Sequence, residues 1–303
     1  FVDEFQDLNR TQLELLKAWV GDRDDLCVVG DPDQAIYGWN GADAGYLTEF
    51  EQAFAGATVV ELVTNHRSAP TIQRAANAVL GRTTASEEGI GHRPTITEYP
   101  DGDAEARGIA RHLRHAREPG TKWGVHAVLT RTNDQLSTIA RALDELDVPY
   151  RMRGRGGMLR MPAVPATVDR LVTAGPDIVA AVRDLVQDAD DGPAAHLATL
   201  AEQYIAEDQA PHGAAFRSWL RTVRPGDLDG DRDAVDLVTF HAAKGLEWQH
   251  VVIAGAERGY VPIRDDDPEE QRLLYVAVSR AEQTLHLTWA RERVLGGQVV
   301  YRD

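Results

Sequence analysis

The sequence predicts an α/β protein with parallel sheets and a helical insertion. Short apolar runs rich in β-branched residues recur along the chain, and amphipathic runs such as NRTQLELLKAWV at 9–20 alternate with several of them. This alternation is typical of parallel α/β organisation. Between residue 162 and about residue 230 the sequence becomes Ala-rich and contains no strand-like run. We therefore expect two α/β regions separated by helices.

Four apolar runs in the first part of the chain predict buried strands that end at polar turns. They are FVDE at 1–4, LCVVGD at 26–31, ATVVELV at 57–63 and HAVLTR at 126–131. Cys27, the single cysteine, lies in the second run, so we expect it to be a small core residue. One cysteine also excludes an intrachain disulfide framework and favours a reducing setting.

The C-terminal part of the chain predicts a second α/β region. Its strand-like runs are VDLVTF at 235–240, HVVIAG at 250–255 and TLHLTWA at 284–290, and EEQRLLYVAVSRAE at 269–282 predicts a helix before the last strand. Two polar stretches are typical of surface segments. These are GRTTASEEGIGHRP at 81–94, expected to be an exposed loop, and PGDLDGDRDA at 225–234, expected to be an acidic linker.

Length and charge limit the class of protein. The 303 residues fit two domains, and the formal net charge is −16. Taken alone, this charge argues against a nucleic-acid partner, because phosphate binding relies on Lys and Arg, although a binding groove depends only on local charge. No apolar run approaches the ~20 residues that cross a bilayer. We therefore expect a soluble, cytoplasmic protein with no membrane partner.

The stretch VDEFQD at 2–7 ends an apolar run in Asp3 and Glu4. In P-loop ATPases a strand delivers an Asp that holds Mg²⁺, and a neighbouring acid can polarise the attacking water. Asp-Glu pairs also occur on many ordinary surfaces, so this stretch is weak evidence by itself. The second stretch changes that assessment.

VVGDPDQAIYGWNGAD at 28–43 also ends an apolar run in an acid and then turns towards Gln34. A glutamine at a strand end can hydrogen-bond a γ-phosphate or its attacking water. Tyr37 and Trp39 follow among glycines and could stack on nucleic-acid bases, an interaction of about 1–3 kcal/mol per base. The alternative is that both rings only pack on their own loop.

Taken together, these stretches resemble motifs II and III of the UvrD/PcrA/Rep family of superfamily 1A DNA helicases. Three further stretches are similar to motifs IV, V and VI of that family and appear in the same order. They are NHRS at 65–68, VTFHAAKGLEWQHV at 238–251 and EEQRLLYVAVSRA at 269–281. The resemblance covers nearly the whole chain except the helical stretch and the loops.

The resemblance implies RecA-like P-loop NTPase folds and a set of catalytic residues. Asp3 would bind Mg²⁺, Glu4 would be the general base, and Gln34 would sense the γ-phosphate of ATP. Arg67 and Arg280 would be two guanidinium groups that reach that phosphate, since planar forked donors match phosphate oxygens. Without the family, Arg280 would be assigned to a solvated or ion-paired helix surface.

The resemblance also assigns binding positions. His66 would lie against adenine, Glu247 would contact the nucleotide ribose and help to couple it to the DNA side, and Gly245 would be a further cofactor-binding residue. The implied contacts with DNA come from Tyr37, Trp39, Thr239 and His241, with Lys244 and Arg131 expected to contribute to a local basic groove. For His241, a capping or core position is an equal alternative.

This sequence departs from the family pattern at several points. His66 stands where the family usually has Tyr, and Trp248 stands where it commonly has Phe. No G-x-x-x-x-G-K-[ST] sequence, the phosphate-cradling loop, occurs in the 303 residues, and GRGGM at 154–158 does not replace it. We therefore expect the chain to be the C-terminal part of a longer protein whose N-terminal half carries that loop.

The expected domains follow from the motif positions. Residues 1–63 are predicted to be part of RecA-like domain 1A, and residues 64–161 and 231–303 to form domain 2A. Residues 162–230 would be a helical insertion that replaces a full 2B domain.

For a complete protein, the resemblance implies an ATP-dependent DNA helicase or translocase that moves 3′ to 5′ on single-stranded DNA. ATP and Mg²⁺ would be its cofactors, single-stranded DNA and single-strand/duplex junctions its partners, and DNA repair or recombination its process. One alternative is a non-catalytic DNA-binding or scaffold module descended from such a helicase. Another is a helicase subunit of a recombination nuclease complex. This chain alone is expected to be inactive.

Overall fold

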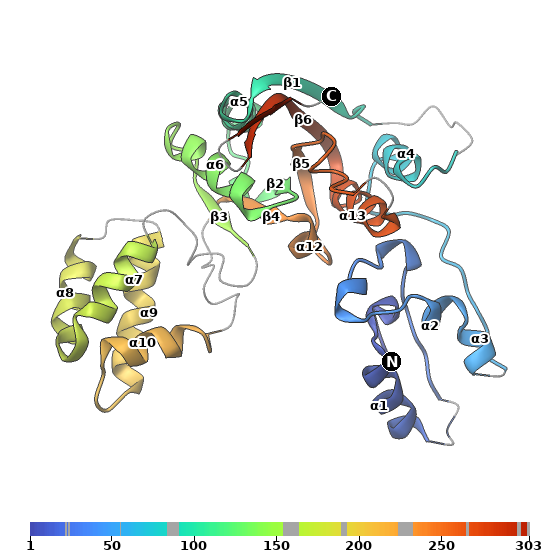
Figure 1. The fold of residues 1–303 in the computed structure, drawn as a ribbon, viewed down its shortest axis with the longest axis horizontal. Helices are drawn as coiled ribbons and strands as arrows, with labels where there is room; N and C mark the ends of the chain where they lie inside the picture. The colour runs from blue at the N-terminus through green and yellow to red at the C-terminus, as the bar shows by residue number, and fades with distance from the viewer. Residues whose placement is uncertain are drawn as a thin grey trace. The chain divides into compact units, whose positions relative to one another are not determined.

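The computed structural model describes residues 1–21, 23, 25–54, 56–83, 91–153, 164–188, 193–223, 233–264, 267–295 and 298–301. Their contacts divide them into two compact units. Figure 1 shows the helices and strands of both. Unit 1 comprises Phe1–Thr97, Ala243–Trp289 and Tyr301–Asp303, and unit 2 comprises Glu98–Ala242 and Ala290–Val300. In the described part of the chain no helix is long and apolar enough to cross a membrane.

The N-terminal segment of unit 1 consists of short helices and turns. Helix α1 begins with a capping box: the Asn9 side chain accepts the Gln12 N–H, and the Gln12 side chain accepts the Asn9 N–H. Its hydrophobic residue Leu13 is buried, whereas Trp19 is exposed. The elements are η1 (Phe5–Asp7), α1 (Arg10–Val20), η2 (Pro32–Gln34), η3 (Gly38–Asn40), α2 (Gly45–Thr48), α3 (Phe50–Ala53) and α4 (Pro70–Val79).

The second segment of unit 1 contains a parallel strand pair and a helix. Strand β5 (Trp248–Ala254) pairs in parallel with β6 (Ala281–Leu295), for example at Val251 and Leu285. Helix α13 (Pro268–Val278) starts with Pro at its first position, and the Asp267 side chain accepts a hydrogen bond from the Glu269 N–H. Helix α13 packs against α4 and β5, so the second segment and the first share one core.

Unit 2 is built on three parallel strands. Strand β4 (Val235–Thr239) lies between β2 (His126–Thr130) and β3 (Tyr150–Met152), and β2 is buried along its whole length. Such an apolar run is typical of a parallel strand covered on both faces. Helices α5 (Gly102–Ala116) and α6 (Asn133–Asp144) pack against each other, and the short helices η4 (Trp123–Val125) and α12 (Phe240–Ala243) complete this part.

The helical stretch of unit 2 contains no strand among its described residues. Its helices are α7 (Val164–Thr173), η6 (Gly175–Asp177), α8 (Ile178–Asp188), α9 (Pro193–Glu207) and α10 (Gly213–Leu220). Tyr204, Phe216 and Trp219 form an aromatic cluster, with ring centroids 5.4–6.1 Å apart. This cluster and the buried aliphatic side chains give the helices their own core.

Two strands cross the division between the units. Strand β1 (Thr95–Asp101) and strand β6 each run from unit 1 into unit 2, β1 pairs with β6, and β7 (Gln298–Tyr301) also pairs with β6. The α/β fold class and the strands predicted at 126–131, 235–240, 250–255 and 284–290 are confirmed. The helix predicted at 9–20 is confirmed, and the helix predicted at 269–282 is confirmed as far as Val278, since β6 begins at Ala281.

Three predicted strands are wrong. FVDE and LCVVGD form only the isolated parallel bridge between Val2 and Val28, and ATVVELV is not a strand. Val60, Leu62 and Val63 are 75–87% exposed, so this run is not buried. Cys27 is also exposed, which contradicts the expected core position. The first two runs pair only with each other at this single bridge, and the third run has no burial to favour a strand. Residues 84–90 of the predicted loop, residues 225–232 of the predicted linker and GRGGM at 154–158 lie outside the described residues.

Candidate active site

Glu4 occupies an unusual backbone position in unit 1. Its φ angle is +52°, in the left-handed region that non-glycine residues rarely adopt, and its N–H donates to Asp3 Oδ1 over 2.9 Å. The buried Gln6 donates its side-chain amide to Glu4 Oε2 and accepts the Asp31 N–H at 3.0 Å. Both acids remain exposed at the end of the first apolar run. The local fold therefore presents two oriented carboxylates to solvent.

Gln34 is held at both ends of its side-chain amide. Its Nε2 donates to Asp31 Oδ2 over 2.8 Å, and its Oε1 accepts a hydrogen bond from Arg280 Nη2 at 3.3 Å. Asp31 also caps η2, because its Oδ1 accepts the Asp33 N–H. Since Gln6 binds the Asp31 N–H, one chain of hydrogen bonds runs from Glu4 through Gln6 and Asp31 to Gln34. Two of the residues predicted to act on ATP are therefore connected.

Arg280 is a buried cation, with 1% of its surface exposed. Besides Gln34, its guanidinium donates to Val276 O, Leu246 O and Ser279 Oγ over 3.0–3.1 Å. Burial and the nearby positive charge of Arg67 lower the pKa of Arg280 to about 10, so it stays protonated at neutral pH. The alternative of a solvated helix surface is wrong for this residue.

The NHRS turn brings Arg67 to the same region of unit 1. Asn65 Oδ1 accepts the Arg67 and Ser68 N–H groups, and Ser68 Oγ donates to Ala281 O over 2.7 Å, next to Arg280. Arg67 Nε lies 2.6 Å from Glu247 Oε2, with both side chains about half exposed. His66 is exposed beside Arg67. The turn therefore carries Arg67 to a position where its charge acts on Arg280.

Lys244 was expected to contribute to a basic groove for DNA, but the structure buries its side chain. Its side chain is 5% exposed, and its Nζ lies 2.6 and 2.7 Å from the two carboxylate oxygens of Asp7. It also donates to Gln34 O over 2.7 Å. A buried, ion-paired lysine does not line a groove for DNA, so that expectation is wrong. The signal in the sequence was a lone cation in the apolar stretch Ala242–Leu246, because a buried charge needs a partner.

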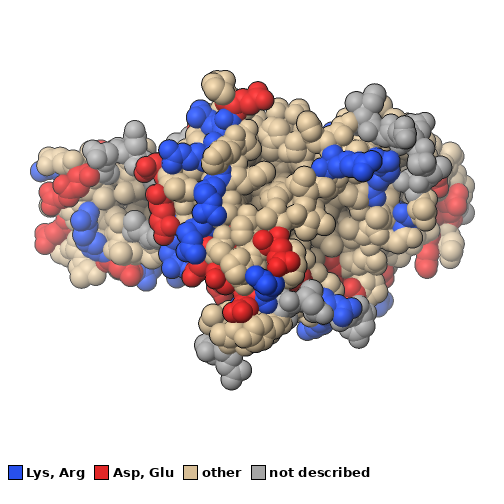
Figure 2. All heavy atoms as spheres, turned by 90° about the horizontal axis from the view of Figure 1, so that it is seen from above, with Lys and Arg blue, Asp and Glu red and all other residues tan. Residues whose placement is uncertain are grey.

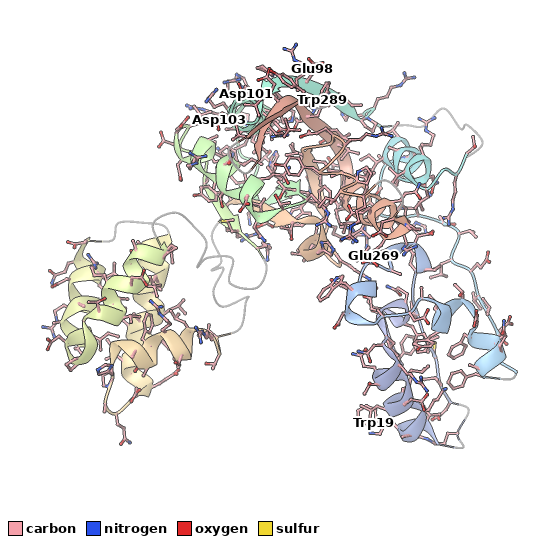
Figure 3. All side chains as sticks on the ribbon, viewed as in Figure 1. Trp19, Glu98, Asp101, Asp103, Glu269 and Trp289 are labelled. Atoms are coloured by element: carbon pink, nitrogen blue, oxygen red, sulfur yellow. The ribbon has the colours of Figure 1, made fainter. Side chains whose placement is uncertain are left out.

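Side chains of α13 and the segment after α4 hold the turn that carries Gln34. Arg82 forms a two-pronged pair with Asp33, at 2.5 and 2.8 Å, and Arg272 Nε donates to Ala35 O over 2.8 Å. Glu269, in the first turn of α13 (Figure 3), accepts the Gly38 N–H at 3.2 Å. A Cβ at Gly38 would collide with this carboxylate. Burial raises the pKa of Glu269.

The two aromatic residues of the turn differ in exposure. Trp39 is 72% exposed, whereas Tyr37 is partly buried, and their rings meet edge to face with centroids 6.3 Å apart. Lys244 Nζ lies 5.2 Å from the centre of the Tyr37 ring, within the range of a cation–π contact. Trp39 therefore has the exposure that base stacking requires, and Tyr37 links it to the charged residues.

The remaining predicted positions lie around motif V. Gly245 has a φ of +80°, which glycine adopts without strain, and it is exposed directly after Lys244. Thr239 ends β4 opposite Thr130, and His241 lies in α12. Thr239 and His241 belong to unit 2 and are partly buried. Their assignment to the DNA backbone stays a prediction.

The donor set can be compared with what Mg²⁺ requires. The described residues contain no group of three or more His, Cys, Asp or Glu side chains that would hold a metal ion by themselves. Mg²⁺ at phosphate-transfer sites is commonly held by one or two carboxylates together with phosphates and water. The exposed carboxylate of Asp3 fits this mode.

Comparisons with known proteins give the family. The model described as UvrD/REP helicase N-terminal domain matches residues 1–55, and the model described as UvrD-like helicase C-terminal domain matches residues 60–164 and 195–292. The chain belongs to the UvrD-like helicase family. The second family model leaves residues 165–194 unmatched, and α8 lies in that interval. The resemblance inferred from the motifs and the predicted helicase-type fold are thereby confirmed.

Three curated relatives illustrate the family membership. ATP-dependent DNA helicase UvrD2 of Mycobacterium tuberculosis is 32% identical over 98% of this chain and 48% of its own length. ATP-dependent DNA helicase Rep of Escherichia coli is 25% identical over 99% of this chain and 61% of its own length. ATP-dependent DNA helicase PcrA of Staphylococcus aureus is 28% identical over 98% and 55%.

The extent of these matches matters for function. This UvrD-family chain spans about half the length of the curated relatives it matches. A solved structure, the C-terminal domain of a possible DNA helicase from a Lactobacillus species, covers 75% of this chain and 88% of its own chain at 14% identity. Its TM-score is 0.40, too weak a likeness to add to the family assignment.

Proposed function

We propose that this chain supplies the C-terminal working parts of an ATP-dependent DNA helicase or translocase. The proposed motor moves 3′ to 5′ on single-stranded DNA, acts at single-strand/duplex junctions, and serves DNA repair or recombination. Because the chain spans about half the length of its relatives, another segment would supply the phosphate-cradling loop. A cytoplasmic location, expected from the single cysteine, is part of this proposal.

The contact between Arg280 and Gln34 is the observation that best supports hydrolysis. It joins a buried guanidinium to a glutamine that Gln6 and Asp31 connect to Glu4. A guanidinium group and a side-chain amide in contact are groups that can stabilise the charge that develops on a transferred phosphoryl group. The site thus resembles a phosphoryl-transfer site in its chemistry as well as in its motifs.

Each residue has a proposed step. Glu4 accepts a proton from the attacking water, and Gln34 orients that water or contacts the γ-phosphate. Arg280 and Arg67 neutralise the charge on the phosphate oxygens in the transition state. Asp3 would hold Mg²⁺, which supplies further charge neutralisation when bound. Gly245, Glu247 and His66 contribute to the nucleoside side of the site.

The DNA side of the proposal rests on exposed aromatic rings and local charge. Trp39 and Tyr37 are assigned to base stacking, and Thr239 and His241 to the DNA backbone. Figure 2 shows Lys and Arg side chains gathered in bands on one face, although the net charge is −16. The acidic total is therefore compatible with local binding of phosphates.

The rival function is a non-catalytic DNA-binding or scaffold module. A full gene product without a G-x-x-x-x-G-K-[ST] loop would favour it, because ATP hydrolysis by this family needs that loop. The connected arrangement of Glu4, Gln34 and Arg280 argues for hydrolysis instead, because a scaffold has no use for it.

The test is steady-state ATP hydrolysis, with and without single-stranded DNA, by the full product of the gene and by this chain alone. Glu4→Gln is the matched variant, since it keeps the shape of the side chain and removes the base. DNA-stimulated turnover that disappears in Glu4→Gln would support a motor. A full gene product with no turnover would leave the scaffold function as the better account.

A further inference from the structure

We propose that Lys244 is a positioning residue that couples the DNA-facing aromatic turn to the general base. It does so by binding Asp7 and Gln34 at once and by lying over the ring of Tyr37. This proposal deepens the proposed function and rests on it, since it assumes that Glu4 serves hydrolysis and that Tyr37 faces DNA.

The contacts of Lys244 satisfy its ammonium group from two segments. The Asp7 carboxylate lies 2.6 and 2.7 Å from Nζ, and the Gln34 carbonyl accepts at 2.7 Å. Asp7 ends η1, three residues after Glu4, whereas Gln34 ends η2. An ammonium group has three donors and no acceptor, so these partners use its whole capacity. Lys244 therefore fixes the spacing between the two segments.

Two further groups surround the same ammonium. Glu4 Oε2 lies 3.5 Å from Nζ, and the centre of the Tyr37 ring lies 5.2 Å from it. One cation thus lies close both to the proposed base and to Tyr37, the ring that contacts Trp39. A displacement of Tyr37 by a stacked base would change the position of Lys244, and with it the electrostatic environment of Glu4.

The positive charge of Lys244 affects the ionisation of the acidic groups around it. Burial raises the pKa of Asp7, and Lys244 counteracts that rise through its hydrogen bond and its charge. Burial also raises the pKa of Tyr37, and the negative charges of Asp7 and Glu4 add to the effect. Without Lys244, the negative charges of Asp7 and Glu4 would lie near each other and beside the Tyr37 ring, and like charges at close range repel.

The lysine also acts at the point where Arg280 binds. The backbone carbonyl of Gln34 accepts a hydrogen bond from Lys244, and its side-chain oxygen accepts one from Arg280. Both cations therefore bind the same residue, one at the backbone and one at the side chain. A shift of the Gln34 backbone would move the amide that meets Arg280. Lys244 can therefore change the geometry of two proposed ATP-contacting residues, Glu4 and Gln34, without touching ATP itself.

The first test follows amide hydrogen exchange in the gene product, comparing Lys244→Met with the wild type. The amides of Leu8 and Ala35 close η1 and η2, and we expect both to exchange faster in the variant. Lys17→Met is the matched control, because the Lys17 side chain is 44% exposed and pairs with the exposed Glu14 across the surface of α1. Faster exchange in one segment alone, or in neither, would overturn the proposed link.

The second test separates coupling from stability with a double variant. Asp7→Asn combined with Lys244→Met removes both charges, so we expect it to recover most of the thermal stability that Lys244→Met loses. We expect the stimulation of ATP turnover by single-stranded DNA to stay lowered by about fivefold or more in the double variant, with KM for ATP little changed.

The outcomes are distinguishable. Wild-type stimulation in the double variant would mean that Lys244 only balances the charge of Asp7, and the coupling proposal would be wrong. If the wild type itself shows no DNA-stimulated turnover, the proposed function fails instead. The exchange measurement then still decides whether Lys244 joins the two segments.

Discussion

Replacing Arg280 with Ala should reduce ATP hydrolysis far more than it reduces ATP affinity. A guanidinium that stabilises the transition state of phosphoryl transfer typically contributes a factor of about 10³–10⁵ to kcat. We propose this role for Arg280 because it is buried and donates to Gln34 Oε1 at 3.3 Å. We therefore expect kcat to fall by about 10³ or more, whereas the nucleotide affinity changes by less than about tenfold.

The same change has a cost in stability that can be worked out from the structure. Arg280→Ala leaves Val276 O and Leu246 O without the donor they have now, at about 1–3 kcal/mol for each group left unpaired. Relief of the desolvated charge offsets part of that loss, because burial disfavours the cation. We expect a net destabilisation of about 2–4 kcal/mol, measured by urea unfolding.

Arg280→Lys is the control that separates charge from geometry. It keeps a cation but cannot form the planar fork that reaches Gln34 and a phosphate together. We expect it to fold with a smaller loss of stability and still to hydrolyse ATP slowly in single-turnover assays. Turnover within tenfold of the wild type in a folded Arg280→Ala protein would refute the assignment of this residue to the site.

Three further predictions address the DNA side, unit 2 and the second arginine. Trp39→Ala should weaken single-stranded DNA binding by about 1–3 kcal/mol in fluorescence anisotropy and leave nucleotide affinity and thermal stability nearly unchanged, because the ring is 72% exposed; equal losses of both affinities would show a structural role. Asp236→Asn should destabilise unit 2 by about 3–5 kcal/mol in urea unfolding, because the buried carboxylate pairs with two arginines. Its control, Asp169→Asn in an exposed pair, should cost less than about 1 kcal/mol, and similar losses at both sites would contradict the burial argument. Arg67→Gln should lower kcat and leave the melting temperature within about 2 °C, since its pair with Glu247 is half exposed; a large fall in melting temperature would contradict that view.

The regular elements were predictable wherever sequence pattern and burial agree. β2, β4 and β5 are apolar runs at interior positions of the strand order. Helix α13 has a clear start in the sequence, because Asp267 caps its N-terminus. The runs at 1–4, 26–31 and 57–63 have the same composition and yet form no extended strand. Composition predicts that a run is suited to burial, but burial itself requires a partner surface, and no described element covers Leu62 or Val63.

The site was predictable residue by residue but not as a network. Motif spacing named Glu4, Gln34 and Arg280, whereas the bridging roles of Gln6 and Asp31 depend on backbone turns that no periodicity reveals. Lys244 was misplaced because its partner Asp7 is 237 residues away along the chain. Long-range ion pairs of this kind leave only indirect traces in a single sequence. The roles of the site residues in ATP and DNA binding stay predictions.

We propose that Glu4, Gln34 and Arg280 serve an ATP-driven motor on DNA. The most direct measurement is ATP-dependent unwinding by the full gene product of a duplex with a 3′ single-stranded tail, beside a matched duplex with a 5′ tail and the Glu4→Gln variant. We expect strand separation of the 3′-tailed substrate only, and none by Glu4→Gln. Unwinding that persists in Glu4→Gln, or ATP hydrolysis that DNA does not stimulate and that separates no strands, would contradict it.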